Sequence, residues 1–266
     1  MVRLCRFAAA LVVLPVLAQV NTNSPAHRIS SPAAFFDDAE TAAPGSVAIS
    51  SDFSYGRVLS GHDIAFPSTY VTVGLRKRLD FSAGFGYVRS QFENVRISGI
   101  GDTYLGVKGV LVSETRWRPA VAVKPMLEIL GTPSIANNLL APKRVNVLLP
   151  LTLQKSFPSF RVYYTGGYFS RGIQFHSLAY ELNRWARVTP AVVVSHSRLT
   201  RELDLVSELG LNRSRSDALC IVSVPLTPRW GLFGSAGRTF GRTDGNSTRI
   251  QVSGGVSFTF RAWGER

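Results

Sequence analysis

Apolar and polar residues alternate through almost the whole chain after residue 44, and this feature most limits the possible folds. Around residue 105, for example, Leu105 and Val107 alternate with Tyr104 and Lys108. A period of two is typical of a β-strand with one apolar and one polar face. Only the stretch 199–211 suggests a short helix, and an ordinary surface loop is the alternative there. The sequence therefore predicts an all-β fold.

The alternation divides into about twelve strand-length segments, joined by connections that switch regularly between short and long. The segments span 45–57, 67–78, 81–92, 100–113, 118–130, 144–156, 160–171, 175–183, 187–199, 217–227, 230–241 and 248–261. The longer connections include 58–66, 93–99, 131–143 and 200–216, while 172–174 is short and breaks the pattern. Such regularity predicts an up-and-down antiparallel transmembrane β-barrel with short periplasmic turns and longer outer loops, because a Greek-key sandwich has no reason to maintain it.

Composition helps to decide which face of the strands meets which solvent. In a soluble sandwich the apolar face points inward, whereas in a transmembrane barrel it points to lipid and the polar face lines the lumen. Charged residues make up 18% of the chain, against about 25% in a typical soluble domain. The deficit favours the barrel, and a soluble periplasmic β-sandwich remains a weaker alternative.

The N-terminal residues predict export. Arg3 and Arg6 precede an apolar run over 7–17, which is long enough for a signal peptide and too short for a membrane-spanning helix. We expect a signal peptide at 1–18, a flexible segment at 19–44, the barrel at 45–261 and a C-terminal tail at 262–266. The predicted location is the outer membrane of a Gram-negative cell.

Net charge narrows the choice of partners. The chain carries +13, which becomes +11 once Arg3 and Arg6 leave with the signal peptide. An exported chain rarely meets nucleic acid, so the expected partners are anionic lipid head groups of the outer membrane, the barrel-assembly machinery and a small solute of unknown identity.

Aromatic residues cluster with basic ones at the short turns. Rings beside cations are favoured at a lipid head-group boundary, because the ring is apolar in its body and polar at its edge. The expected girdle comprises Trp117, Trp185, Trp230, Phe258 and Phe260.

The polar faces of the strands supply a candidate solute path along the lumen. Its expected members are Arg76, Arg78, Asp102, Tyr104, Lys108, Lys124, Glu128, Glu181, Arg249 and Gln251. We expect Lys108 to pair with carboxylates such as Asp102, Glu128 or Glu181, since lumenal charges are costly unless they are paired or wet. The net-basic charge of the path predicts passive passage of anions or polar aromatics, and the alternative is a closed barrel plugged by 19–44, with a structural or surface-interaction role.

No constellation in the sequence supports catalysis, a metal or a cofactor. Ser195 and Ser197 flank His196, but neighbouring residues on a strand point to opposite faces, so they cannot form a dyad. The glycines of 99–106 precede no helix, which argues against a phosphate loop, and the aspartates are too scattered to hold a metal. We expect a protein that is not an enzyme.

Three short motifs resemble an outer-membrane family. The stretch SGIGDTYLGVKGVLV, with Gly101, Asp102, Leu105, Gly106 and Lys108, resembles a pattern of the bacterial MetA-pathway of phenol degradation transporter family. PLTPRWGLFGSAGRTFG resembles the penultimate hairpin of that family, and RIQVSGGVSFTF its closing strand. The resemblance implies a barrel of about twelve strands that passes small, often hydrophobic or aromatic solutes. The chain departs from the usual terminal Phe or Trp, because six residues follow Phe260.

Overall fold

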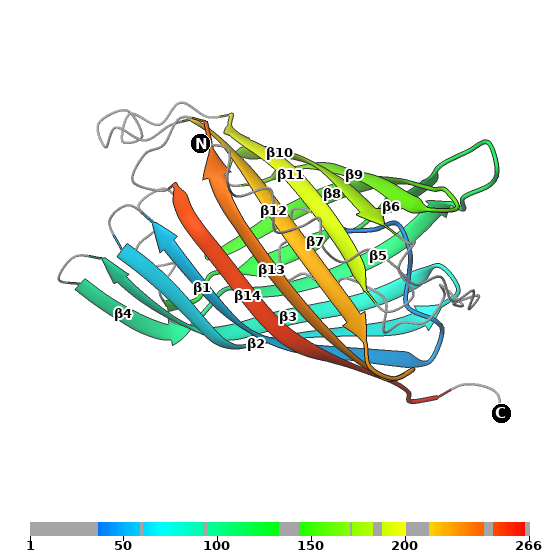
Figure 1. Cartoon of the computed structure of the whole chain (residues 1–266), viewed down its shortest axis with the longest axis horizontal. Coiled ribbons are helices and arrows are strands. Elements are labelled where there is room, and N and C mark those ends of the chain that lie inside the picture. The colour runs from blue at the N-terminus through cyan, green and yellow to red at the C-terminus, as the bar shows by residue number, and fades with distance from the viewer. Residues whose placement is uncertain are drawn as a thin grey trace, which may run out of the picture.

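The chain folds into a closed antiparallel β-barrel (Figure 1). The computed structural model describes residues 37–58, 61–92, 95–132, 144–170, 172–182, 188–200, 213–241 and 247–263. The strands are β1 (Ser46–Val58), β2 (Gly61–Arg76), β3 (Leu79–Phe92), β4 (Val95–Ile100), β5 (Thr103–Val112), β6 (Ala120–Val123), β7 (Met126–Ile129), β8 (Val145–Ser156), β9 (Phe160–Phe169), β10 (Ile173–Leu182), β11 (Thr189–Leu199), β12 (Ser214–Pro225), β13 (Trp230–Phe240) and β14 (Thr248–Arg261).

Two barrel strands are each interrupted once, so the fourteen segments form a barrel of 12 strands. β4 pairs with the second half of β3 and β5 with its first half, with Gly101 and Asp102 between them. β6 and β7 likewise pair in turn with β5 and β8, on either side of Lys124 and Pro125. Proline has no N–H to donate to a ladder, which explains the break at Pro125. The predicted strand number is confirmed.

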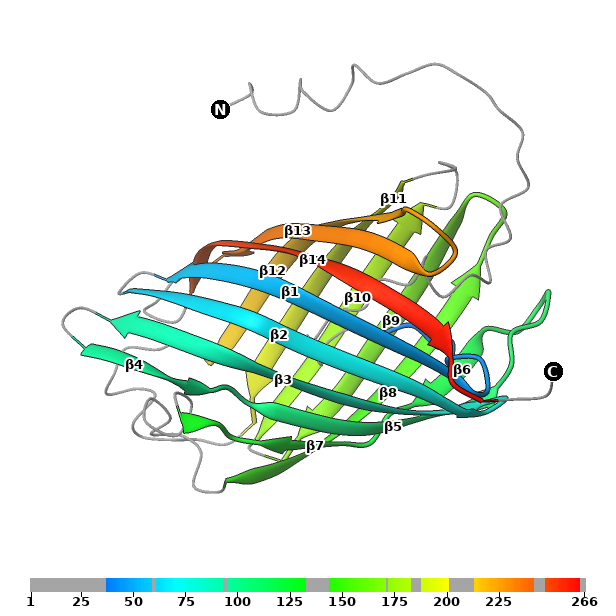
Figure 2. The ribbon, with the colours of Figure 1, turned by 90° about the horizontal axis from the view of Figure 1, so that it is seen from below.

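The barrel closes between the first and last strands. β1 pairs with β14 from Ser46 opposite Arg261 to Arg57 opposite Ile250. Beyond the last strand, the backbone N–H of Ala262 donates to the carbonyl of Gly45 at 2.7 Å. Figure 2 shows the two ends of the sheet, β1 in blue and β14 in red, lying side by side along the wall. Closure satisfies the backbone groups that an open edge would leave unpaired.

Side chains alternate between the two sides of the wall in the sense expected for a membrane barrel. On β8, Leu149 and Leu151 are exposed on the outside, whereas Thr152 and Gln154 are buried inside. The exposed side of the other strands is also apolar, with Phe85, Leu111, Leu178 and Val222 among its members. No helix among the described residues is long and apolar enough to cross a membrane.

Two predicted outer loops are wrong. β2 already begins at Gly61, so most of the stretch 58–66 is strand, and β4 covers most of the stretch 93–99. In the first stretch the polar residues His62 and Asp63 are adjacent and interrupt the alternation, whereas in the second the alternation of Val95 and Ile97 with Arg96 and Ser98 is regular but short. Pairing with the neighbouring strand nevertheless continues there, with Asp63 opposite Ser90 and Arg96 opposite Gln91. The short helix proposed at 199–211 lies almost wholly outside the described residues.

Candidate lumenal site

Residues 37–44, which precede β1, lie inside the barrel (Figure 1, blue). The backbone N–H of Ala39 donates to Oε1 of Gln154 at 2.9 Å, and that of Ala42 to Oδ2 of Asp80 at 3.1 Å. Both acceptors are buried polar residues of the lumenal wall. Ala39 itself packs against Ala120 and Ala122 of β6. Backbone and side chains of this part of the predicted flexible segment thus both bind the wall. The flexibility of the segment stays a prediction, and residues 19–36 lie outside the described part.

Asp37 is clamped between two lysines. Its Oδ1 lies 2.8 Å from Nζ of Lys108, and its Oδ2 lies 2.8 Å from Nζ of Lys124. Burial alone would raise the pKa of Asp37, but the charges of the two ammonium groups outweigh burial and hold its pKa well below the ordinary value. The carboxylate thus remains charged. Its two ion pairs attach the segment before β1 to neighbouring strands of the wall.

Arg161 of β9 binds acids of the same segment and of the wall. Its guanidinium makes three hydrogen bonds to the carboxylate of Glu181, at 2.8 to 3.0 Å. It also lies 2.9 Å from Oε1 of Glu40 and 3.8 Å from Oδ2 of Asp38. Asp38 reaches Lys108 as well, at 3.2 Å. A guanidinium presents a planar set of donors, so it can hold carboxylates from the wall and from the segment at the same time.

We call Lys108, Lys124 and Arg161 the lumenal cation cluster. Lys124 also donates to the hydroxyl of Tyr70 at 2.9 Å, and Lys108 to the backbone carbonyls of Asp38 and Glu40. The side chains of the three cations are 8 to 12% exposed. Buried charges are stable only when paired and hydrogen-bonded, and the acids of residues 37–40 supply much of that pairing.

The expected partners of Lys108 are wrong. Its ion pairs within the described residues are with Asp37 and Asp38. Asp102 lies at the break between β4 and β5, where it accepts the backbone N–H of Gly131 at 2.9 Å. Glu128, fully buried, accepts from the hydroxyl of Tyr104 at 2.9 Å and from the amide of Asn146 at 3.0 Å.

Four other members of the predicted solute path lie away from this cluster. Arg76 ends β2 and Arg78 lies in the turn that follows, and both are exposed. They therefore sit at the rim of the barrel rather than along its lumen. Arg249 and Gln251 share the lumenal face of β14 with Thr259 and are exposed near the other end of that strand.

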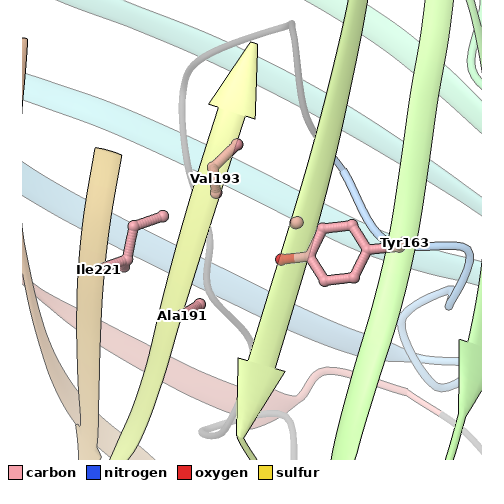
Figure 3. Close-up of a cluster of buried hydrophobic side chains, with 5 residues drawn as sticks. Tyr163, Ala191, Val193 and Ile221 are labelled. Atoms are coloured by element: carbon pink, nitrogen blue, oxygen red, sulfur yellow. The ribbon is translucent and has the colours of Figure 1, made fainter. Parts of the chain in front are cut away.

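An apolar patch lies on the lumenal wall beside the cluster (Figure 3). Tyr163 of β9 packs with Val193 of β11 and Ile221 of β12, and the patch also includes Ala179 and Ala191. All five are at most 3% exposed. Tyr163 is two residues from Arg161 on the same face of β9, so charged and apolar surfaces adjoin within the lumen.

Four of the five residues of the expected aromatic girdle lie at the end of the barrel that carries the short turns. Trp230 packs on Phe258 with ring centroids 4.5 Å apart, and Phe258 stacks on Phe260 at 5.6 Å. Trp117 is 83% exposed, in the connection between β5 and β6. Trp185 lies outside the described residues. Stacked rings on an outward face suit a lipid boundary.

Sequence reasoning missed Arg161 and the acids that bind the cluster. Asp37, Asp38 and Glu40 fall in a stretch without alternation, where no strand register relates them to the wall. The available signal was the acidic run Asp37-Asp38-Ala39-Glu40, shortly before the first strand of a basic chain.

Comparison with known proteins establishes the fold. No family model matches the chain, and no curated protein matches it in sequence. Among solved structures, it is similar to the COG4313 outer membrane channel from Pseudomonas putida F1, with 14% identity, a TM-score of 0.64, and coverage of 87% of this chain and 100% of that one. It is also similar to the NanC porin, with 9% identity, a TM-score of 0.55, and coverage of 79% and 98%. The KdgM porin in complex with disordered oligogalacturonate gives 12% identity, a TM-score of 0.51, and coverage of 79% and 99%. The chain thus has the fold of outer-membrane channel barrels.

Proposed function

We propose that this protein is an outer-membrane channel for passive passage of small solutes, with anions favoured. The observation that carries the proposal is a lumenal face that bears buried Lys108 and Lys124, within a wall whose outside is apolar. Cations that line a pore attract anions and repel other cations, and these two lysines do so when the acids of residues 37–40 do not neutralise them. The similarity in fold to channels and porins supports the same function.

The proposal includes the cellular setting. A signal peptide at 1–18 would direct export, and the barrel-assembly machinery would insert the chain into the outer membrane, where the outward apolar side chains meet lipid. The motifs around Gly101 and Lys108 keep the MetA-pathway transporter family as the proposed relative, with hydrophobic or aromatic solutes as further candidates.

Reconstitution into planar bilayers tests the function. We expect ion conductance and, under a salt gradient, a reversal potential that indicates anion preference. Heat-modifiable migration of the same preparation on detergent gels verifies that the barrel is folded. A folded barrel that never conducts would refute the channel function.

A plugged barrel with a structural or surface-interaction role is the second candidate, and the seat of residues 37–44 favours it. Their ion pairs with the lumenal cation cluster fill part of the lumen. Deletion of residues 19–44 separates the two candidates. A channel conducts with the segment present and more strongly without it, whereas a plugged barrel conducts only after its removal.

We propose no catalytic role. His196 Nδ1 lies 2.9 Å from Oγ of Ser216 on the neighbouring strand, on the outward face of the barrel. Asp217 follows Ser216 directly and so points into the lumen, where it binds Arg215 and Thr239. Its carboxylate therefore cannot orient His196 in the manner of a catalytic triad.

A further inference from the structure

The lumenal cation cluster has the geometry of a carboxylate-binding site. One carboxylate, that of Asp37, bridges two ammonium groups at 2.8 Å each. A second, that of Asp38, lies between Lys108 at 3.2 Å and Arg161 at 3.8 Å. The two bonds of Asp37 are charge-assisted and short, and such bonds are among the strongest hydrogen bonds in proteins.

The cations belong to the wall, whereas these carboxylates do not. Arg161 has a wall partner in Glu181, but among the described residues Lys108 and Lys124 form their ion pairs with the segment alone. Asp80 faces Lys108 across the β3–β5 pairing, yet its Oδ2 accepts the backbone N–H of Ala42. Withdrawal of the segment would also free Asp80, so two buried ammonium groups would share one wall carboxylate and would still need a further anion.

The site is built from rigid elements. Lys108 lies within β5, Lys124 lies between β6 and β7, and Arg161 is the second residue of β9, beside the turn from β8. The hydroxyl of Tyr70 fixes Lys124 from β2, and Glu181 fixes Arg161 from β10. Side chains held in this way keep their positions when a ligand is exchanged, so the cluster is preorganised.

We propose that the lumenal cation cluster binds small dicarboxylates, and that Asp37 and Asp38 occupy it as a tethered competitor. A dicarboxylate that enters the lumen exchanges its two carboxylates for those of the segment and displaces the segment from the wall. This deepens the proposed function and rests on it only for the route of entry. Because the competitor is covalently attached, it is present at a high effective concentration, and free solute binds weakly until the competitor is removed.

Calorimetry on the folded full chain in detergent tests the site with succinate as the probe. We expect the double variant Asp37→Asn, Asp38→Asn to bind succinate about tenfold more tightly than the unaltered chain, because the competitor has lost its charge. Glu114→Gln, which removes an acid near the short turns, should bind as the unaltered chain does. Succinamide, which has the same length without charge, should give no binding heat. Equal or absent succinate binding in the double variant overturns the proposal.

A second measurement keeps all three acids of the segment. Ala39→Cys in a Cys220→Ser background places a thiol on the buried segment, where Ala39 is 2% exposed. Succinate should accelerate maleimide labelling of this thiol, and succinamide should not. Labelling that is insensitive to succinate overturns displacement even if the double variant fails to fold. Neither measurement uses conductance. A barrel that binds succinate without conducting therefore refutes the channel and retains the site. A barrel that conducts without binding succinate retains the channel and refutes the site.

Discussion

The lumenal faces of β5–β10 and of β13–β14 differ in what they carry. The first, the packed wall, bears large or charged side chains such as Lys108, Gln154, Arg161 and Phe175, and most of its members are buried. The second, the open wall, bears mainly Ser, Gly and Thr, and Gln251 on it is exposed. The alternation of the strands is the same in both, so side-chain size and charge decide which part of the lumen is filled. A barrel of this strand number can therefore combine a sealed side with a wet one.

The largest effect should follow from loss of a charge on the packed wall. Arg161→Leu leaves Glu181, 2% exposed, without its guanidinium partner. Removal of one member of a buried pair costs about 3–5 kcal/mol, because the remaining charge is desolvated and unpaired. Denaturant unfolding in detergent measures the loss.

The matched control is Arg249→Leu on the open wall. Arg249 is exposed, so its loss should change the free energy of unfolding by no more than about 0.5 kcal/mol. Similar losses for the two variants would remove the distinction between the walls.

A covalent lock on the packed wall should change conductance strongly. Ala39 packs with Ala122, so cysteines at both positions, with Cys220→Ser, can form a disulfide when oxidised. We expect a lower bilayer conductance after oxidation than after reduction, because the segment can no longer leave its seat. Ala122→Cys alone serves as the control, and identical currents in the two redox states would show that the segment does not limit flow.

A bulky residue on the open wall should have a moderate effect. Ser253→Phe places a ring on the lumenal face, beside Ser235 on the neighbouring strand. The barrel should still fold, while its conductance falls because the wet cross-section narrows. Val252→Phe, on the lipid side of the same strand, should conduct as the unaltered chain does. Equal conductance in the two variants would place the solute path elsewhere.

The smallest effect is expected from mild acid. The pKa of Asp37 is depressed in the folded chain, so its ion pairs are fully formed above the ordinary carboxylate pKa and are lost only as pH falls through the depressed value. Between pH 7 and about pH 5, above the ordinary Asp pKa, Asp37 should therefore keep its ion pairs, and the segment should stay bound to the wall. Maleimide labelling at Ala39→Cys in the Cys220→Ser background, expressed at each pH relative to the labelling of a small free thiol, measures this, because the thiolate fraction of any cysteine falls with pH. Much faster labelling at the lower pH, absent in Asp37→Asn, would show that the clamp by Lys108 and Lys124 is weaker than the geometry indicates.

The barrel could be predicted from sequence because the alternation of apolar and polar residues is visible within each strand. Residues two apart on a strand share a face, so the run around Leu151 and Gln154 shows the two environments without any knowledge of the neighbouring strands. Charges placed within such runs, including Lys108 and Glu128, could be assigned to the polar face for the same reason.

The partners of those charges could not be predicted in this way. Lys108 pairs with Asp37, which lies 71 residues away in a stretch with no period. Only the folded wall brings them together. The prediction also failed at residues 58–66, where pairing with an existing strand extends the sheet although the two faces no longer differ in polarity, and at 93–99, where the alternating run is only a few residues long.

The seam between β1 and β14 is as extensive as a hairpin within the chain, and Gly45 and Trp263 come within one backbone hydrogen bond of each other there. The wall therefore behaves mechanically as a hoop: load applied to one strand is shared around the full circumference, and no strand is an end from which the sheet can be peeled. In the wall the first and last strands are neighbours like any other pair, so the two ends of the chain can no longer be told from its middle. Only the segment before β1, which enters the lumen, marks where the chain begins to form the barrel.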